Sequence, residues 1–502
     1  MDALSLLADG FAGAFTLQNL LWVLIGCLLG TAVGVMPGLG SSMAVALLLP
    51  VTFALEPTAA FIMFAGVYFG GLFGDSTMGI LMNTPGQASA IASTFEGHRM
   101  AKNGRAAQAL AVAAIGAFIG GFISSILVVF LAPVLADFST KFGPAEYLAL
   151  AIFAFAATSS VVTDSAVKGL LSLALGLGVA VVGIDGVTGI PRFTMDSNYL
   201  FDGISLVTVT VAILALGEVF YSASVARHQE EGKIIRPKGR AWLTGAEFKE
   251  AAPAWGRGTL IGLPFGIIPA GGADIPTFLA YGTERKLDRR RKNPQFGDKG
   301  AIRGLAAPEA AGNATTGMAM GALLALGLPI SATAAIMLAA FRQYGLQPGP
   351  LLFERSPELV WALLASFFIA MVVLLAINLP FAMLWAKLLL IPAPYLYAGI
   401  TVFCGLGIYA TSSSIFDLLL LLGIGLLGFL MRMNDYPLAP LIIGMVLGPL
   451  AETSLRDALT SSSGDFSVLF SGPIVITLYA VLVLMLLLTL RSKVTKKTGN
   501  DI

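Results

Sequence analysis

The chain has 502 residues, of which 57% are hydrophobic and only 12% are charged. Soluble domains carry about 25% charged residues, so this composition excludes an ordinary soluble domain and predicts an all-α polytopic membrane protein. The formal net charge of +1 gives no electrostatic basis for binding nucleic acid. Cys27 and Cys404 lie in apolar runs, which favours buried thiols over a disulfide, and no Cys/His cluster typical of a zinc site occurs.

Apolar runs of spanning or nearly spanning length follow one another along the chain and predict roughly twelve spans. In chain order they cover 17–54 (interrupted), 59–94 (interrupted), 107–135, 145–162, 166–184, 203–222, 255–281 (interrupted), 305–341 (interrupted), 357–386, 395–411, 413–431, 437–451 and 473–490.

The first run is broken in its middle. Gly26, Gly30 and Gly34 recur every four residues, so they share a helix face that another backbone can approach closely. Pro37 and the glycines after it then interrupt the helix, because Pro lacks a backbone donor and Gly adopts turn conformations. Ser41 and Ser42 follow at the start of the next helical piece, where we expect an N-cap. Such a break at membrane depth is tolerated only where protein or a water-filled cavity satisfies the backbone.

The second half of the chain repeats this pattern. Five positions recur at one constant offset, 258 − 26 = 232: Gly258, Gly262, Gly266, Pro269 and Gly272 match Gly26, Gly30, Gly34, Pro37 and Gly40. In addition, residues 84–90 resemble residues 328–334. Paired breaks at corresponding positions of two halves indicate the binding site of a secondary transporter.

The distribution of Lys and Arg predicts the orientation of these halves. Basic clusters occur at 99–105, 227–257, 285–303 and 491–497, which we expect to be cytoplasmic, whereas no basic residue precedes Arg99 and the N-terminus is expected to be periplasmic. The first hairpin, formed by the interrupted run around Pro37, is then entered from the periplasm. The second hairpin, around Pro269, is entered from the cytoplasm, so we predict inverted-topology repeats. The chain divides into a first membrane repeat (1–222), a cytoplasmic linker (223–254), a second membrane repeat (255–490) and a cytoplasmic tail (491–502).

Three acidic residues are candidates for ion coupling. Asp75 lies inside an apolar span without a nearby basic residue, which costs several kcal/mol unless the carboxylate is protonated, paired or bound to a cation. Asp274 follows the second hairpin, and Glu309 stands four residues before Asn313, on the same helix face. The alternatives are that Asp75 caps a broken helix end or pairs with a distant residue, that Asp274 caps the following half-helix, and that Glu309 is a charge near a helix N-terminus. We expect no metal site other than Na⁺ near Asp75 and Asp274.

No Lys or Arg occurs between Met1 and Arg99 or between Arg303 and Arg342, so a bound anion would rely on helix N-termini, each of which carries about half a positive charge. The breaks place such ends at 38–42, 85–89, 271–274 and 330–333. We therefore predict that a carboxylate lies between the two halves. The residues predicted to bind it are Gly38, Gly40, Ser41, Ser42, Asn83, Pro85, Gly86, Ser89, Gly271, Gly272, Asn313, Ser331 and Thr333.

The sequence does not predict an enzyme. The stretch ending in Asp75 lacks the first Gly of the Gly-x-Gly-Asp motif of intramembrane aspartyl proteases. No P-loop or His-Glu-x-x-His motif occurs, and both histidines, His98 and His228, lie in polar stretches. The alternatives to a transporter are a passive channel or scaffold subunit and, less favoured, a membrane enzyme.

Three stretches carry a resemblance to a known family. They are Gly34–Gly40 (Gly-Val-Met-Pro-Gly-Leu-Gly), Tyr68–Gly86, which ends in Asn-Thr-Pro-Gly, and Glu309–Asn313. From about residue 17 to 490, the chain resembles the large membrane subunit of the tripartite tricarboxylate transporter family, TctA-like. It departs at 269–272 and 328–331, where the family usually has Pro-Gly-Ile-Gly and Ile-Pro-Gly-Ser, and at Gly312, where an Asn pair is usual.

The resemblance implies uptake of an organic di- or tricarboxylate across the bacterial inner membrane, driven by an H⁺ or Na⁺ gradient and without another cofactor. It also implies two partners, a small membrane subunit of about four helices and a periplasmic solute-binding protein.

Overall fold

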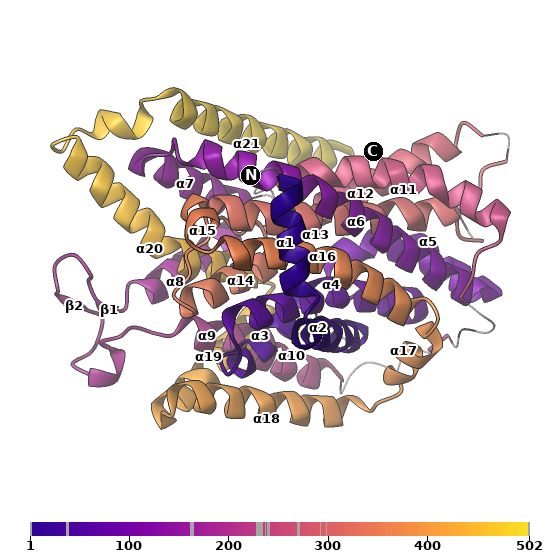
Figure 1. Cartoon of the computed structure of the whole chain (residues 1–502), viewed down its shortest axis with the longest axis horizontal. Helices are drawn as coiled ribbons and strands as arrows, with labels where there is room; N and C mark the ends of the chain where they lie inside the picture. Colours follow the sequence, from indigo (N-terminus) through magenta and orange to yellow (C-terminus); the bar gives the residue numbers. More distant parts are fainter. Residues whose placement is uncertain are drawn as a thin grey trace.

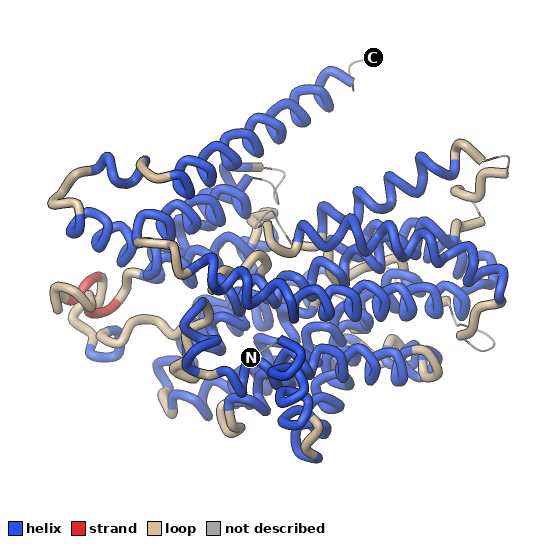
Figure 2. The backbone as a smooth tube through the Cα atoms, turned by 45° about the horizontal axis from the view of Figure 1, so that its top comes forward, coloured by secondary structure: helices blue, strands red, loops and turns tan. Residues whose placement is uncertain are grey.

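The protein, described by a computed structural model, is almost entirely helical (Figures 1 and 2). The structure describes residues 3–499 except 37–39, 161–164, 227–233, 236, 238–240, 269–271, 292 and 298. Within these residues, eight helices are long and apolar enough to cross a membrane, and five shorter apolar helices accompany them. The prediction of an all-α polytopic membrane protein is therefore confirmed, and both Cys27 and Cys404 are buried as expected.

The first half consists of helices around two breaks. Its elements are α1 (Ala3–Ala14), α2 (Leu17–Val35), α3 (Ser41–Thr52), α4 (Pro57–Met82), α5 (Ala88–Met100), a π-helical turn (Ala101–Arg105), α6 (Ala106–Ser139), α7 (Pro144–Ser160), α8 (Ala166–Ala180), β1 (Gly183–Ile184), β2 (Pro191–Arg192), a 3-10 turn (Asn198–Leu200), α9 (Leu206–Thr210), a π-helical segment (Val211–Leu216) and α10 (Gly217–Ala226).

The second half has the same order of broken helices at its start. Its elements are α11 (Gly245–Phe265), α12 (Asp274–Asp288), α13 (Ile302–Leu326), α14 (Ala332–Gln343), α15 (Pro350–Arg355), α16 (Pro357–Asn378), α17 (Ala382–Leu388), α18 (Ala393–Ser412), α19 (Ile415–Met433), α20 (Leu438–Ser461), a 3-10 turn (Phe466–Phe470) and α21 (Pro473–Gly499).

Two element boundaries differ from the sequence-based division. Helix α11 begins at Gly245, inside the predicted linker, because Thr244 and Glu247 form a capping box that starts a helix there. Helix α21 continues through the predicted tail to Gly499, since no helix-breaking residue separates the apolar run from the basic end.

Glycine faces hold one pair of helices together in each half. A Cβ added at Gly26, Gly30 or Gly34 of α2 would meet the backbone of Met63, Val67 or Gly71 of α4. In the second half, a Cβ at Gly258 or Gly262 of α11 would meet the backbone of Ala307 or Ala311 of α13. The two pairs therefore use the same close backbone approach, as the glycine spacing predicted.

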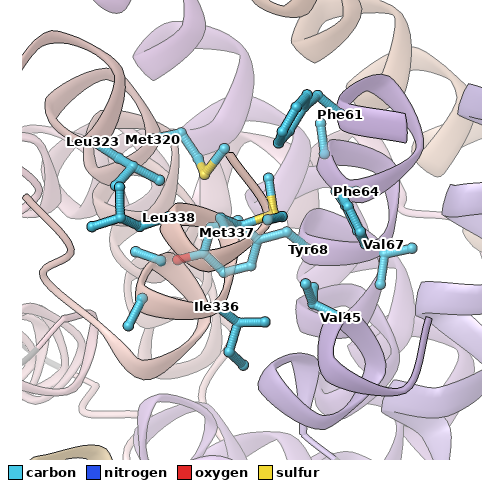
Figure 3. Packing of buried hydrophobic residues seen from close by; sticks show 14 of the residues in the cluster. Val45, Phe61, Phe64, Val67, Tyr68, Met320, Leu323, Ile336, Met337 and Leu338 are labelled. Carbon is cyan, nitrogen blue, oxygen red and sulfur yellow. The ribbon is translucent and has the colours of Figure 1, made fainter. Parts of the chain in front are cut away.

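Helices α4 and α13 form the centre of the molecule. Both are buried along nearly their whole length and apolar around most of their circumference, which is typical of a central helix. Figure 3 shows Phe61, Phe64 and Tyr68 of α4 facing side chains of α13 and α14. Each central helix ends in a left-handed residue, Asn83 (φ 63°) in α4 and Gly327 (φ 68°) in α13, and a break follows.

The outer helices carry the exposed apolar surface. In α18 and α19, Phe403, Leu406, Leu419 and Leu422 are more than half exposed, a pattern that suits lipid rather than water. At one end of the molecule, far left in Figure 1, the β1–β2 hairpin projects beyond the helices.

Ion pairs tie this hairpin to α20. Arg192 and Arg456 both pair with Asp185 and Glu452. Hydrogen bonds from Thr188 and Val187, together with Arg456, hold the pKa of the Asp185 carboxyl well below its usual range. The hairpin of the first half is thereby fixed to a helix of the second.

The glycine contacts generate a test of the helix pairing. We expect Gly258→Ala to lower the thermal midpoint of the purified protein, because its methyl group would overlap the Ala307 backbone; overpacking of this kind costs about 1–3 kcal/mol. Gly256→Ala, on the same helix, is the matched control, since an added Cβ there meets nothing within 4 Å. It should leave the midpoint unchanged or raise it, because Ala favours helix by ~1 kcal/mol over Gly. Equal midpoints for the two variants would contradict the close α11–α13 approach.

Candidate functional site

Four helices begin around one cavity of about 200 Å³. They are α3 and α5 of the first half and α12 and α14 of the second. The cavity is lined by residues at or next to each of these starts: Ser42, Gln87, Ala88, Ser89, Gly272, Ala273, Asp274, Ile330, Ser331, Ala332 and Thr333. Helices α4, α13, α7 and α20 close the walls with Tyr68, Leu72, Thr315, Thr316, Ala319, Thr158, Ala439 and Ile443. We call this space the tip cavity.

The polar groups of the tip cavity are hydroxyls, the Gln87 amide and the Asp274 carboxyl. No Lys or Arg lines it among the described residues, so its positive potential comes from the helix starts, and Asp274 is its acidic side chain. The Ser41 hydroxyl donates to Gln87 Oε1 at 3.1 Å, which leaves the buried Gln87 Nε2 without a partner. An unpartnered N–H donor facing a cavity indicates room for an acceptor.

Hydroxyl contacts join the two halves at the tips. The Ser41 and Thr333 hydroxyls lie 3.3 Å apart, and the Tyr68 and Ser331 hydroxyls lie 3.4 Å apart. Each pair has one member from the first half and one from the second, so the cavity depends on how the halves sit together.

Asp75 holds the turn before α5. One carboxylate oxygen accepts the Gly86 N–H in a short hydrogen bond and the other accepts the Gln87 N–H at 3.2 Å. Because Gln87 is the N-cap of α5, the carboxylate supplies the capping that Gln87's own side chain does not. The structure therefore matches the helix-cap alternative for Asp75, and the Gly86 amide is already occupied.

Glu309 lies in a second, smaller cavity of about 20 Å³. The Ser76 hydroxyl lies 2.8 and 2.9 Å from the two Glu309 carboxylate oxygens, and Ser93 also hydrogen-bonds this carboxylate. Asn313 Nδ2 donates to the Glu309 carbonyl at 3.1 Å, as the four-residue spacing predicted. Asp75 lines the same space. We call it the Glu309 chamber.

Other buried acids of the same bundle have basic partners. Glu284 accepts two hydrogen bonds from Arg257, at 2.6 and 2.9 Å, and Glu96 pairs with Arg99 at 3.0 Å. Asp75 and Glu309, 1% and 4% exposed, form no ion pair with the Lys and Arg side chains that the structure describes. The contrast singles out these two carboxylates, because an intramembrane charge without a counterion is expensive.

The predicted binding residues do not all lie at one place. Five line the tip cavity: Ser42, Ser89, Gly272, Ser331 and Thr333. Gly40 and Ser41 stand beside it against Gln87, whereas Pro85 and Gly86 belong to the turn that Asp75 holds. Asn313 lies in the Glu309 chamber, and Asn83 is exposed at the C-terminus of α4. Gly38 and Gly271 lie outside the described residues.

Two capping expectations are corrected by the structure. Helix α3 starts at Ser41 with Gly40 as its N-cap, so Ser41 is free to bond Gln87 and Thr333. Asp274 is the first residue of α12, with Ala273 as N-cap and no side-chain cap hydrogen bond. Glu309 is likewise not at a helix start, because α13 begins seven residues earlier at Ile302.

Sequence reasoning missed Tyr68, Gln87 and Thr316. Tyr68 and Thr316 hydrogen-bond each other across the cavity wall. Gln87 lies inside the 84–90 stretch that resembles 328–334, and Tyr68 is a polar ring in an apolar run. Neither feature of the sequence distinguishes a residue that lines a cavity from one that packs against a neighbouring helix.

Comparison with known proteins agrees with this architecture. The model of the Tripartite tricarboxylate transporter TctA family matches residues 20–443. The chain belongs to the TctA family. It is 39% identical, over 98% of both chains, to an Agrobacterium vitis protein described as an uncharacterised 52.8 kDa protein in the TAR-I ttuC' 3' region.

A second Agrobacterium vitis protein, described as an uncharacterised protein in the TAR-II ttuC' 3' region, is 38% identical over 45% of this chain and 95% of its own length. No solved structure matches the chain. Membership of the TctA family identifies a transporter subunit and agrees with the resemblance of the three motif stretches.

The Asp75 contacts generate a prediction for this TctA-family site. We expect Asp75→Asn to increase hydrogen exchange of the Gly86 and Gln87 amides, because an Asn side chain offers one acceptor oxygen where the carboxylate offers two. Asp274→Asn, at a different helix start, should leave exchange of these amides unchanged. Unaltered exchange in Asp75→Asn would show that the turn is held by other contacts. Peptide-level exchange followed by mass spectrometry is a sufficient measurement.

Proposed function

We propose that the chain is the large membrane subunit of a solute-binding-protein-dependent transporter that takes up an organic di- or tricarboxylate across the bacterial inner membrane, driven by an ion gradient. The family supports the transporter subunit. The observation that carries the substrate class is the tip cavity, where four helix starts and the unpartnered Gln87 Nε2 converge without a basic side chain among the described residues.

Several features of the tip cavity suit a compact carboxylate. Its volume of about 200 Å³ is below the ~300–1,000 Å³ typical of sites for drug-sized ligands. Helix N-termini bind carboxylates through free N–H groups and the helix dipole. The substrate's carboxylates would lie against the starts of α3, α5 and α14, with the hydroxyls of Ser42, Ser89 and Ser331 as further donors.

Ion coupling is assigned to the intramembrane acids. Asp75, Asp274 and Glu309 all lie at or beside the cavities, and a H⁺ or Na⁺ bound there would offset the negative charge of the substrate. Asp274 itself faces the tip cavity, where an uncompensated carboxylate would repel the substrate. Binding of the cation would therefore favour binding of the anion, and binding of the anion would favour that of the cation.

The partners follow from the tripartite family. We propose that the chain works with two partners: a small membrane subunit of about four helices and a periplasmic solute-binding protein that delivers the carboxylate. The exposed apolar faces of α18 and α19 suit the bilayer or a membrane partner.

The two halves are proposed to be inverted in the membrane. The equivalent glycine contacts of α2–α4 and α11–α13, and the matched ends of α4 and α13, support two related repeats. In Figure 1 the ends of α5 and α12 that lead to basic segments lie on the right, opposite the β1–β2 hairpin on the left. The positive-inside rule then puts the right-hand side in the cytoplasm.

Gln87 gives a direct test of carboxylate binding. We expect Gln87→Glu to reduce uptake of radiolabelled carboxylate by proteoliposomes containing the chain and its partners at least tenfold, equivalent to about 1.4 kcal/mol. The substitution replaces a free donor by a negative charge, whereas Gln87→Ala only removes the donor and should have a smaller effect.

The matched control is Gln343→Glu, which introduces the same charge at the exposed end of α14 and should leave uptake unchanged. Uptake unaffected by Gln87→Glu would contradict carboxylate binding in the tip cavity. Uptake that never exceeds equilibrium with an imposed ion gradient would favour the passive channel.

Topology is tested by cysteine labelling in a Cys27→Ala/Cys404→Ala background. Single cysteines at Lys249 and Lys286 should react with a membrane-impermeant maleimide only after permeabilisation of spheroplasts, and one at Val187 in the hairpin should react without it, because the basic segments are assigned to the cytoplasm. Labelling of Lys249→Cys or Lys286→Cys in intact spheroplasts would contradict the inverted arrangement.

A further inference from the structure

The Glu309 chamber contains a buried oxygen acceptor, Asn313 Oδ1, that lacks a donor. We propose that it binds one Na⁺ ion, held by the Glu309 carboxylate and the Asn313 side-chain oxygen, with the hydroxyl oxygens of Ser76 and Ser93 completing the shell. This inference rests on the proposed function and names its coupling ion and its site.

The orientation of Asn313 is the first argument. The side chain is 3% exposed and its Nδ2 donates to the Glu309 carbonyl, so the amide oxygen must point the other way. That oxygen, Oδ1, is buried and has no hydrogen-bond partner, while the residue lines the chamber. A buried acceptor without a donor is costly, and a cation in the chamber would satisfy it.

The state of the Glu309 carboxylate is the second argument. The Ser76 hydroxyl lies within hydrogen-bonding distance of both carboxylate oxygens, and Ser93 is a further partner. The carboxylate therefore has hydroxyl partners and no ion pair to a described Lys or Arg. A carboxylate at this depth is offset by a bound proton or a bound cation, and the unpartnered Asn313 Oδ1 in the same chamber favours the cation, which that oxygen can ligate.

Charge and size select the ion. The Asp75 oxygens accept the Gly86 and Gln87 amides, so Glu309 is the carboxylate placed to ligate a cation, and a monovalent ion matches its single charge. The volume of about 20 Å³ holds one water-sized particle, since a single water needs about 10–15 Å³. Hard oxygen ligands in a space of this size suit one alkali cation without its water shell; we propose Na⁺, and K⁺ is the competing ion in the test below.

Asp75 connects this ion to the tip cavity. It lines the chamber and holds the amides that precede α5, and Gln87 and Ser89 of that turn line the tip cavity. In this arrangement Asp75 is a positioning residue, and Glu309 and Asn313 are the ion ligands.

The experiment is equilibrium binding of ²²Na⁺ to the purified full-length chain in detergent, without substrate and with choline keeping the ionic strength constant. We expect saturable binding of one Na⁺ per chain and a rise in thermal midpoint with Na⁺ that K⁺ does not reproduce. Asn313→Ala and Glu309→Gln should weaken Na⁺ binding at least tenfold and remove the Na⁺-dependent rise. Asn313→Asp should restore binding, because it returns an oxygen to the same place.

Asn434→Ala is the matched control. Asn434 Nδ2 also donates to the carbonyl four residues earlier, Leu430, at 2.8 Å, but the side chain is exposed and does not line the chamber. It should keep wild-type Na⁺ affinity, and size-exclusion profiles in choline report folding of every variant.

Absence of saturable Na⁺ binding by the wild type, or wild-type affinity in both Asn313→Ala and Glu309→Gln, overturns the inference. Concentrative carboxylate uptake driven by a proton gradient without Na⁺ would also overturn it while leaving the proposed function intact. Saturable Na⁺ binding that these variants lose, in a protein that moves no carboxylate, would support the Na⁺ site and refute the proposed function.

Discussion

A helix interrupted inside a membrane leaves backbone N–H groups that water does not reach, and the rest of this structure depends on how they are satisfied. Four such helix starts meet around one cavity. At α5 the amides of Gly86 and Gln87 bond the Asp75 carboxylate, and at α14 the Ser331 hydroxyl accepts the Ala334 N–H. The starts of α3 and α12 have no side-chain cap hydrogen bond.

The two cavities have opposite chemical demands. The tip cavity combines helix starts with the unpartnered donor Gln87 Nε2, whereas the Glu309 chamber combines a carboxylate with the unpartnered acceptor Asn313 Oδ1. An anion satisfies the first and a cation the second. Asp75 borders the chamber and fixes the turn of the tip cavity, so the two spaces share one side chain.

The breaks and the glycine faces could be predicted from the sequence because each depends on local geometry. Gly at every fourth position and Pro before Gly dictate a smooth helix face and a helix end whatever lies nearby. The intramembrane acids Asp75 and Glu309 were also recognisable, since a carboxylate in an apolar run is rare.

What the sequence could not provide was the pairing of side chains across the halves. Ser41 reads as an N-cap, yet its hydroxyl bonds Gln87 and lies beside Thr333, 292 positions away. Asn313 reads as a partner of the substrate, yet it lies in the Glu309 chamber. Both outcomes depend on how α4, α5 and α13 approach one another, and no local pattern encodes that approach.

The cross-half contacts explain how an ion could be coupled to a substrate here. Ser41–Thr333 and Tyr68–Ser331 join the halves at the tip cavity, and Ser76–Glu309 joins them at the chamber. A displacement of one half against the other would break contacts in both cavities together, since all three pairs cross the same division. On the proposed function, a ligand that stabilises one set of contacts would therefore stabilise the other. By linkage, a cation in the chamber would raise the affinity of the tip cavity for an anion by the same factor as the anion raises the affinity of the chamber for the cation.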